Sequence, residues 1–133
     1  MTEWKYIEPD QLRKWWMSVK PGLDKIKSVS SESWIVEDVY TDCWNQKSGL
    51  WVGLEDNHFK AFFILQPLGE ELHIWCAWTL ENDYQMVQKG LQFIKNMASE
   101  CGNKYLTFTS HRPGWDRRAK AYGFRPRKWI SEV

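Results

Sequence analysis

The segment 70–79, EELHIWCAWT, constrains the fold more than any other part of the chain, because its pattern is that of a strand with two apolar faces. Strict alternation places its side chains in two sets: His73, Trp75 and Ala77 on one face, and Leu72, Ile74, Cys76 and Trp78 on the other. A strand of this kind lies inside a sheet that helices cover on each side. We therefore expect a layered fold of helices around a central sheet.

Two further strand-like segments precede it, at 50–54 (LWVGL) and 60–68 (KAFFILQPL). The polar residues 55–58 (EDNH) separate them, and this composition is typical of a hairpin turn. The three segments therefore predict an antiparallel meander that ends with the strand at 70–79.

Helical periodicity marks three longer segments and one short one. The first helix follows Pro9 and is expected to end at Pro21 and Gly22. The second lies within 32–46, and the third runs from about 82 to 100, with Gly102 directly after it. A strand at 104–110, a short helix at 113–122 capped by Gly123, and a final strand at 127–133 complete the chain.

The predicted element order is α-α-β-β-β-α-β-α-β in one domain, residues 1–133. This is a mixed α/β (α+β) fold, in which an antiparallel meander leads into a β-α-β crossover and helices cover both faces of a mixed central sheet.

Composition excludes some classes of protein and leaves others open. The net charge of +1 gives no global reason to expect nucleic acid or an anionic membrane as a partner. No apolar run approaches the length of about 18 residues needed to cross a bilayer, so we expect no membrane association and an intracellular protein. Ten tryptophans either fill a core of large rings or partly form a surface for a partner. The cysteines, Cys43, Cys76 and Cys101, lie in apolar runs without metal-ligand spacing, which predicts buried free thiols, no metal site and a reducing compartment.

The element order resembles the fold of the GNAT N-acetyltransferases over nearly the whole chain. Shorter motifs resemble small phage-encoded GNAT-like proteins: EDVY at 37–40, GLWV at 49–52, ASECG at 98–102, RPGWDR at 112–117, Lys120, and GF at 123–124. The second resemblance implies a bacteriophage protein, and some relatives of this kind are internal or connector-associated virion components.

Two features that the resemblance implies for an active enzyme are missing. Active members hold the pyrophosphate of coenzyme A in a glycine-containing turn at the start of the third helix. The matching residues, 82–87 (NDYQMV), contain no glycine, Asp83 adds a negative charge, and Gly90 comes three residues too late. Alignment on the GF motif places Ala119 where a general-acid tyrosine is expected, with Tyr122 about a helical turn away. The chain also ends after one strand where the family usually has two.

Few other residues offer acid–base chemistry. Glu70, Glu71 and His73 are candidates for a base that acts on an amine, although a solvated turn for the glutamates and a place in the sheet for the histidine account for them better. His58 fits a hairpin turn, and His111 lies at a strand end without a carboxylate or thiol neighbour. The sequence therefore assigns no catalytic, coenzyme-binding or metal residue.

The near-neutral total hides a basic segment. Residues 112–128 carry seven basic side chains and a single acid: Arg112, Arg117, Arg118, Lys120, Arg125, Arg127 and Lys128, against Asp116. We call the seven the basic patch. Packing does not require these charges, so we expect them to meet phosphates or an acidic protein surface.

Three functions remain open. The main interpretation is a phage-encoded GNAT-fold protein without acetyltransferase activity or cofactor, which acts by binding as a virion or assembly component in the host cytoplasm or the particle. Its partners would be phage structural proteins or a host protein. The alternative is a divergent N-acyltransferase that uses acetyl-coenzyme A or another acyl-coenzyme A. A third possibility is a binder or inhibitor of a host protein or of DNA through the basic patch.

Overall fold

The computed structural model describes residues 1–81, 83–110, 115–127 and 131–132, with side chains in the last helix from residue 117 onward. The elements in chain order are β1 (Thr2–Ile7), the 3-10 turn η1 (Pro9–Gln11), α1 (Leu12–Val29), α2 (Val36–Trp44), β2 (Gly49–Glu55), β3 (His58–Leu68), β4 (Glu71–Thr79), α3 (Tyr84–Glu100), β5 (Tyr105–Phe108) and α4 (Trp115–Ala121). The sheet has the order β1-β2-β3-β4-β5, antiparallel through β4 and parallel between β4 and β5.

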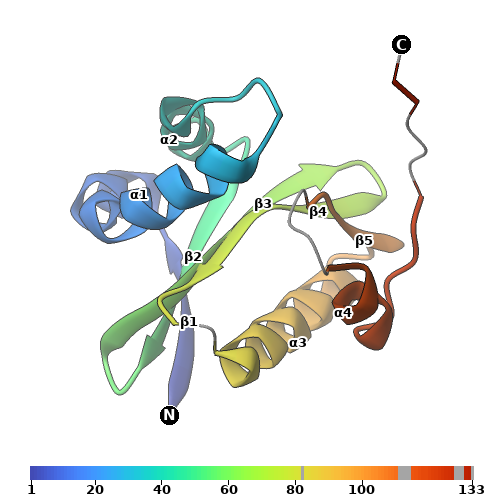
Figure 1. The fold of residues 1–133 in the computed structure, drawn as a ribbon. Coiled ribbons are helices and arrows are strands. Elements are labelled where there is room, and N and C mark those ends of the chain that lie inside the picture. Colours follow the sequence, from blue (N-terminus) through green and yellow to red (C-terminus); the bar gives the residue numbers. More distant parts are fainter. Residues whose placement is uncertain (82, 111–114, 128–130, 133) are drawn as a thin grey trace.

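Helices cover both faces of this sheet, as predicted. Helices α1 and α2 lie on one face and α3 on the other, with α4 beside β5 (Figure 1). The α1/α2 face holds the larger core, which includes Val19, Val39 and Phe62. The α3 face holds a second core, which includes Phe63 and Ile94. The mixed α+β class with a meander and a β-α-β crossover is therefore confirmed.

Strand β1 was not anticipated from the sequence. It forms the edge of the sheet and pairs antiparallel with β2 from Thr2↔Glu55 to Ile7↔Leu50. Its side chains alternate between faces: the Trp4 ring packs on Phe63 on the α3 face, while Lys5 lies over the ring of Trp15 on the α1 face. The charged residues between the aromatic ones obscure the strand signal, as is common for edge strands.

The first helix does not end at Pro21 and Gly22, so that prediction is wrong. Helix α1 continues to Val29 with Pro21 inside it. Proline removes a helical hydrogen bond, but Gly22 and Leu23 are buried against the sheet. A Cβ atom at Gly22 would lie 2.7 Å from Phe62 and 2.8 Å from Trp78, so the backbone contacts the two rings closely. Tertiary packing therefore outweighs the local breaking signal.

The predicted faces of β4 are wrong from Cys76 onward because the strand contains a bulge. The ladder pairs Leu65 with Ile74 and then Ile64 with Cys76, which leaves Trp75 as the extra residue. The alternation reverses there, so Cys76 joins the α1/α2 core and Ala77 pairs with Phe63 on the α3 face. Strict period-two counting cannot anticipate such an insertion.

Other sequence predictions have mixed outcomes. Cys43 and Cys76 are buried free thiols as expected, but Cys101 is exposed, because it is the C-cap residue of α3 rather than part of its apolar stripe. Gly102 follows with a φ of 76°, which confirms it as the residue that ends the helix. The predicted last strand, 127–133, lies largely outside the described residues, and Arg127, Ser131 and Glu132 are not in a strand.

Candidate functional site

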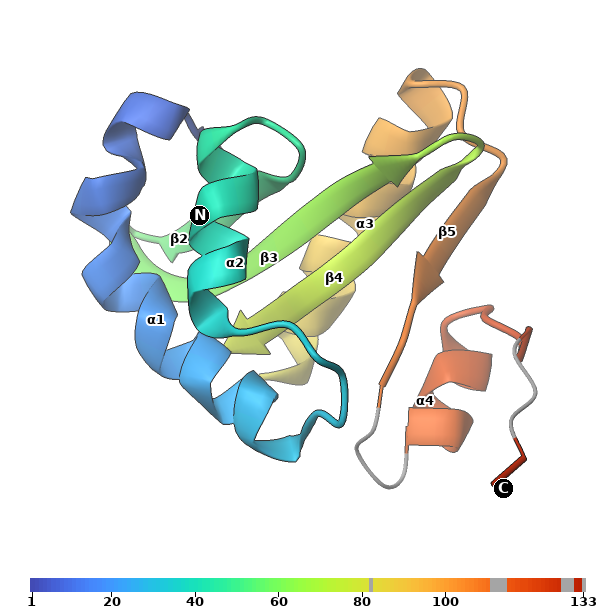
Figure 2. The same cartoon turned by 90° about the horizontal axis from the view of Figure 1, so that it is seen from above.

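The parallel strands β4 and β5 separate partway along their length. They pair from Glu71↔Tyr105 to Ile74↔Phe108, after which β4 continues to Thr79 without a β5 partner in the described part of the chain. Figure 2 shows β5 diverging from β4 in this region. The split exposes one edge of β4, where backbone N–H and C=O groups can pair with a ligand.

A cavity of about 590 Å³ occupies this split and reaches both faces of the sheet. On the α3 side it is bordered by residues such as Ala77, Met86 and Tyr122. On the α1/α2 side it is bordered by Glu32, Trp34 and His73. Its volume lies in the range of small-molecule sites, and its position lets two reactants enter from opposite faces.

His73 lies where the two strands begin to part, one residue before the last pair of the ladder. Its Nδ1 atom is 2.8 Å from the hydroxyl oxygen of Thr107 on β5. The Thr107 hydroxyl donates its single hydrogen to Oε2 of Glu71 at 3.2 Å, so it accepts from the imidazole, and Nδ1 carries the proton. Arg127 pairs with the other oxygen of Glu71. The lone pair is therefore on Nε2 of His73.

Half-burial determines the charge of His73. Burial lowers its pKa below the usual 6.5, and this effect exceeds the opposing influence of the carboxylates of Glu32 and Glu71. The imidazole is therefore neutral at pH 7. A neutral histidine with a defined tautomer on a cavity has the properties of a general base.

Two indoles form the wall beside His73 on the α1/α2 side. Trp34 and Trp75 pack edge to face with ring centroids 5.7 Å apart. The Trp34 indole donates from Nε1 to Oε2 of Glu32 at 3.0 Å. This entrance therefore combines aromatic faces with a carboxylate, which is a chemistry that suits a cationic or amine-bearing molecule.

The start of α3 borders the opposite entrance and is capped internally. Oδ1 of Asp83 accepts a hydrogen bond from the backbone amide of Met86 at 3.1 Å. The backbone oxygen of Asp83 accepts from the amide of Val87 at 3.1 Å. The carboxylate thus occupies a helix N-terminus that would otherwise attract an anion. Asn82, which precedes it, lies outside the described residues.

Arg118 on α4 and Tyr122, directly after the end of α4, border the cavity, and Ala119 does not. They are four residues apart, and the backbone amide of Tyr122 donates to the carbonyl oxygen of Arg118 at 3.1 Å. The guanidinium of Arg118 lies 4.2 Å from the ring centroid of Tyr84, the first residue of α3. A tyrosine therefore does border the cavity, although one turn beyond the position aligned on sequence.

The other candidates are dispersed. Glu70 forms an exposed ion pair with Lys104 at 3.0 Å, and His58 bonds to the backbone oxygen of Asp56 in the β2–β3 turn. His111 lies outside the described residues. Sequence analysis named His73 and Glu71 but missed Thr107. Thr107 lies 34 residues from His73 in the chain, and no local pattern indicates that the two side chains form a hydrogen bond.

The structure divides the basic patch. Arg112 and Lys128 lie outside the described residues, and Arg118 and Arg127 are engaged with Tyr84 and Glu71. Arg117, Lys120 and Arg125 are exposed at the surface. In the described ranges, no group of His, Cys, Asp or Glu is suited to a metal ion, and no helix is long and apolar enough to cross a membrane.

Neither a protein-family model nor a curated protein sequence matches this chain. Many solved structures match its fold. A ribosomal-protein-alanine N-acetyltransferase from Brucella melitensis biovar Abortus 2308 shares 12% identity at a TM-score of 0.71, covering 100% of this chain and 98% of that one. A predicted acetyltransferase from Clostridium acetobutylicum, solved with acetyl-coenzyme A, shares 14% identity at 0.69, with coverage of 100% and 96%.

A third match is an aminoglycoside acetyltransferase from an uncultured soil metagenomic sample, solved with sisomicin. It shares 10% identity at a TM-score of 0.71, covering 99% of this chain and 93% of that one. These likenesses confirm a GNAT-like acetyltransferase fold. They lend no support to a phage origin or a virion role.

Proposed function

We propose that this chain is an N-acyltransferase-like protein, which transfers an acyl group from a thioester to an amine in the cavity at the β4–β5 split. The observation that carries the proposal is the position of His73. The hydrogen bond from Nδ1 to Thr107 fixes the tautomer and leaves Nε2 unprotonated. His73 borders a cavity that reaches both faces of the sheet. The solved structures with the same fold are acetyltransferases, which supports this reading over a purely structural role.

Each of the reacting groups has a residue suited to it. His73 accepts at Nε2 the proton that the amine loses as its nitrogen bonds to the acyl carbon. As the carbon–sulfur bond breaks, the hydroxyl of Tyr122 donates a proton to the departing sulfur. On the α1/α2 side, Glu32 and the indoles of Trp34 and Trp75 hold the amine substrate near the split.

The fit to coenzyme A itself is partial. The apolar cavity and the unpaired edge of β4 suit a pantetheine arm, whose amide groups can pair with strand backbone. The start of α3 does not suit the diphosphate, because Asp83 already caps the amide of Met86 and adds a negative charge. A thioester supplies an activated acyl group when bound. The residues favour a thioester that binds mainly through its pantetheine arm and its acyl group rather than through a diphosphate.

The test is release of free thiol from acyl-pantetheine and acyl-coenzyme A donors, measured with a panel of primary amines. His73→Gln removes the base and should lower the rate at least 100-fold. His58→Gln is the matched control, because His58 is an exposed turn residue whose ring bonds only to local backbone. Equal rates for wild type and His73→Gln would refute the proposed role of His73.

The capped start of α3 and Ala119 favour a second candidate, a GNAT-fold protein that only binds its partner. Under this candidate the partner is a phage structural protein, a host protein or DNA, met through the exposed basic residues Arg117, Lys120 and Arg125. Absence of both thioester binding and thiol release would favour it. Mass spectrometry of purified particles tests the virion version, and a steep loss of DNA affinity with added salt tests the nucleic-acid version.

A further inference from the structure

Ala77 lies in the interior of β4 yet is exposed to solvent. It points to the α3 face, where its ladder partner is the buried Phe63. Buried Ala61 pairs with Thr79 beside it, so the floor at this point is made of small side chains. Helix α3 therefore does not cover the sheet here, and the cavity extends between the helix and the strands.

Trp4 closes the inner end of this extension. Its ring packs against Phe63 at 5.3 Å and Phe93 at 6.3 Å between centroids. Glycines on both sides make room for the indole: a Cβ atom would lie 2.6 Å from the ring at Gly53 and 3.2 Å from it at Gly90. The indole is thus wedged between β2 and α3 and forms a fixed wall.

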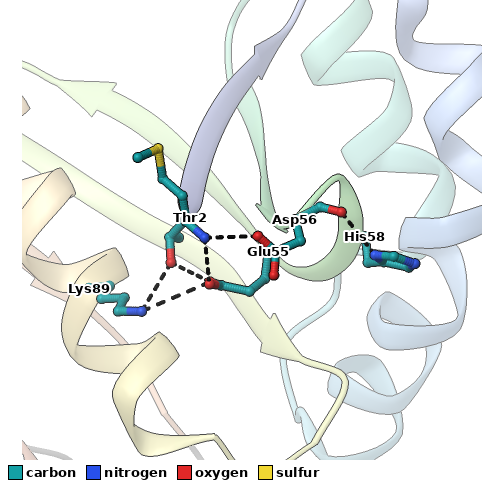
Figure 3. A network of polar contacts seen from close by, with 6 residues as sticks. Thr2, Glu55, Asp56, His58 and Lys89 are labelled. Atoms are coloured by element: carbon teal, nitrogen blue, oxygen red, sulfur yellow. Dashed lines mark hydrogen bonds and ion pairs between the residues drawn. The ribbon is translucent and has the colours of Figure 1, made fainter.

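The roof is the inner face of α3, where Met86, Gly90 and Ile94 are buried. Lys89 fastens this part of the helix to the sheet edge, with Nζ 3.0 Å from the hydroxyl of Thr2 and 3.9 Å from a carboxylate oxygen of Glu55 (Figure 3). The Thr2 hydroxyl also donates to that carboxylate. The residues that line this end of the cavity carry no charge: Ala61 and Ala77 on the floor, Trp4 in the wall, and Met86, Gly90 and Ile94 in the roof. This end of the cavity is therefore apolar.

We propose that this blind pocket holds the acyl chain of the thioester donor, and that the chain is longer than acetyl. The inference rests on the proposed acyl transfer and specifies its substrate class. The pocket opens at the split beside His73, where the thioester carbon must lie, and ends at Trp4. The Ala77 floor is apolar and exposed, so a hydrocarbon chain that binds there removes apolar surface from water, which favours binding.

Strand spacing limits the length of the chain. From the middle of the β4–β5 split to the floor at β3, the pocket spans one and a half to two strand spacings, or about 7 to 10 Å. An extended carbon chain with bonds of about 1.5 Å covers this distance with about six to eight carbons. A hexanoyl or octanoyl group therefore fills the pocket, whereas an acetyl group leaves its inner end empty.

Calorimetric titration with S-acetyl-, S-butyryl-, S-hexanoyl-, S-octanoyl- and S-dodecanoyl-pantetheine tests the inference, because these probes lack the diphosphate that Asp83 opposes. We expect affinity to rise about fourfold for each added methylene up to octanoyl, and then to level off. Binding without dependence on chain length would overturn the acyl-chain pocket and leave the proposed transfer intact. Absence of binding at every length would instead refute the proposed function.

A substitution locates the chain. Ala77→Leu fills the floor from an exposed position, so the fold should persist, and the melting temperature checks this. The variant should lose at least tenfold in octanoyl affinity and keep its acetyl affinity within about twofold. Ala121→Leu, at an exposed position on α4 that does not border the cavity, is the matched control. Unchanged octanoyl affinity in folded Ala77→Leu would show that the chain lies elsewhere and would overturn the inference.

Discussion

Asp83 caps helix α3 through a 3.1 Å hydrogen bond from the backbone amide of Met86 to its carboxylate. The hydrogen bond stabilises the start of the helix, and the negative charge of the Asp83 carboxylate opposes any anionic ligand there. Asp83 thus contributes to stability, and under the proposed acyl transfer it would also restrict which acyl donors bind.

Asp83→Asn separates the two effects. Asparagine caps a helix about as well as aspartate, so the free energy of unfolding should change by less than about 0.5 kcal/mol. Removal of the charge should raise affinity for acyl-coenzyme A by about 3- to 10-fold, with little effect on the matching acyl-pantetheine. Titration of both ligands measures the ratio. If both affinities change equally, the carboxylate does not act on the diphosphate.

Asp83→Ala serves as the comparison, because it removes both the charge and the cap. It should lower the free energy of unfolding by about 1 kcal/mol in urea titration. A variant as stable as wild type would mean that the capping bond contributes nothing measurable.

The Glu71 carboxylate is expected to affect how the proposed activity depends on pH, because it acts on the pKa of His73. Burial lowers the pKa of His73, and the Glu71 carboxylate partly offsets this. A base must be neutral to act, so activity should persist to below pH 6.5 and fall as pH drops through the lowered pKa of His73. Glu71→Gln removes the offset and should move this acidic limb to lower pH. Glu70→Gln is the control, because Glu70 pairs with Lys104 instead. A shift of the limb to higher pH in Glu71→Gln would contradict the assignment.

Structural features set by short stretches of sequence could be predicted here, whereas features set by contacts between distant residues could not. The meander, the β-α-β crossover and the end of α3 at Gly102 follow from periodicity and turn chemistry within short windows. Periodicity failed at Trp75, where one inserted residue reverses the alternation, and at Pro21, where Phe62 and Trp78 hold the helix together. Both errors arise from contacts between residues far apart in the chain.

The site shows the same limit. His73 and Glu71 are close in sequence and were visible as candidates, but Thr107, which determines the tautomer, comes from the next parallel strand. Gly90 was compared with a coenzyme turn and found to be misplaced. In the structure Gly90 makes room for the ring of Trp4. Trp4 lies on β1, a strand that was not predicted because charged residues alternate with its aromatic ones. Such roles depend on tertiary placement and have no local signature.

Gly22 tests the close packing of α1 on the sheet. Alanine favours helix by about 1 kcal/mol over glycine, but its Cβ atom would lie within 2.8 Å of both Phe62 and Trp78. Phe62 is fully buried, so its ring cannot move freely, and overpacking costs about 1 to 3 kcal/mol. Gly22→Ala should therefore lower the free energy of unfolding, measured in urea. Lys14→Ala, at an exposed position on the same helix, should change it by less than about 0.5 kcal/mol.

In the proposed transfer, Tyr122 is the residue that protonates the departing sulfur. It borders the cavity together with Arg118, and its backbone oxygen is fixed by a 2.9 Å hydrogen bond from Lys95. Tyr122→Phe removes only the hydroxyl and should lower kcat by about 10- to 100-fold while KM for the donor changes less than about threefold. Tyr105→Phe, an exposed residue that does not border the cavity, is the control. Thiol release at saturating donor measures both variants. If the effect in Tyr122→Phe falls on KM alone, the hydroxyl binds the donor and does not act as the acid.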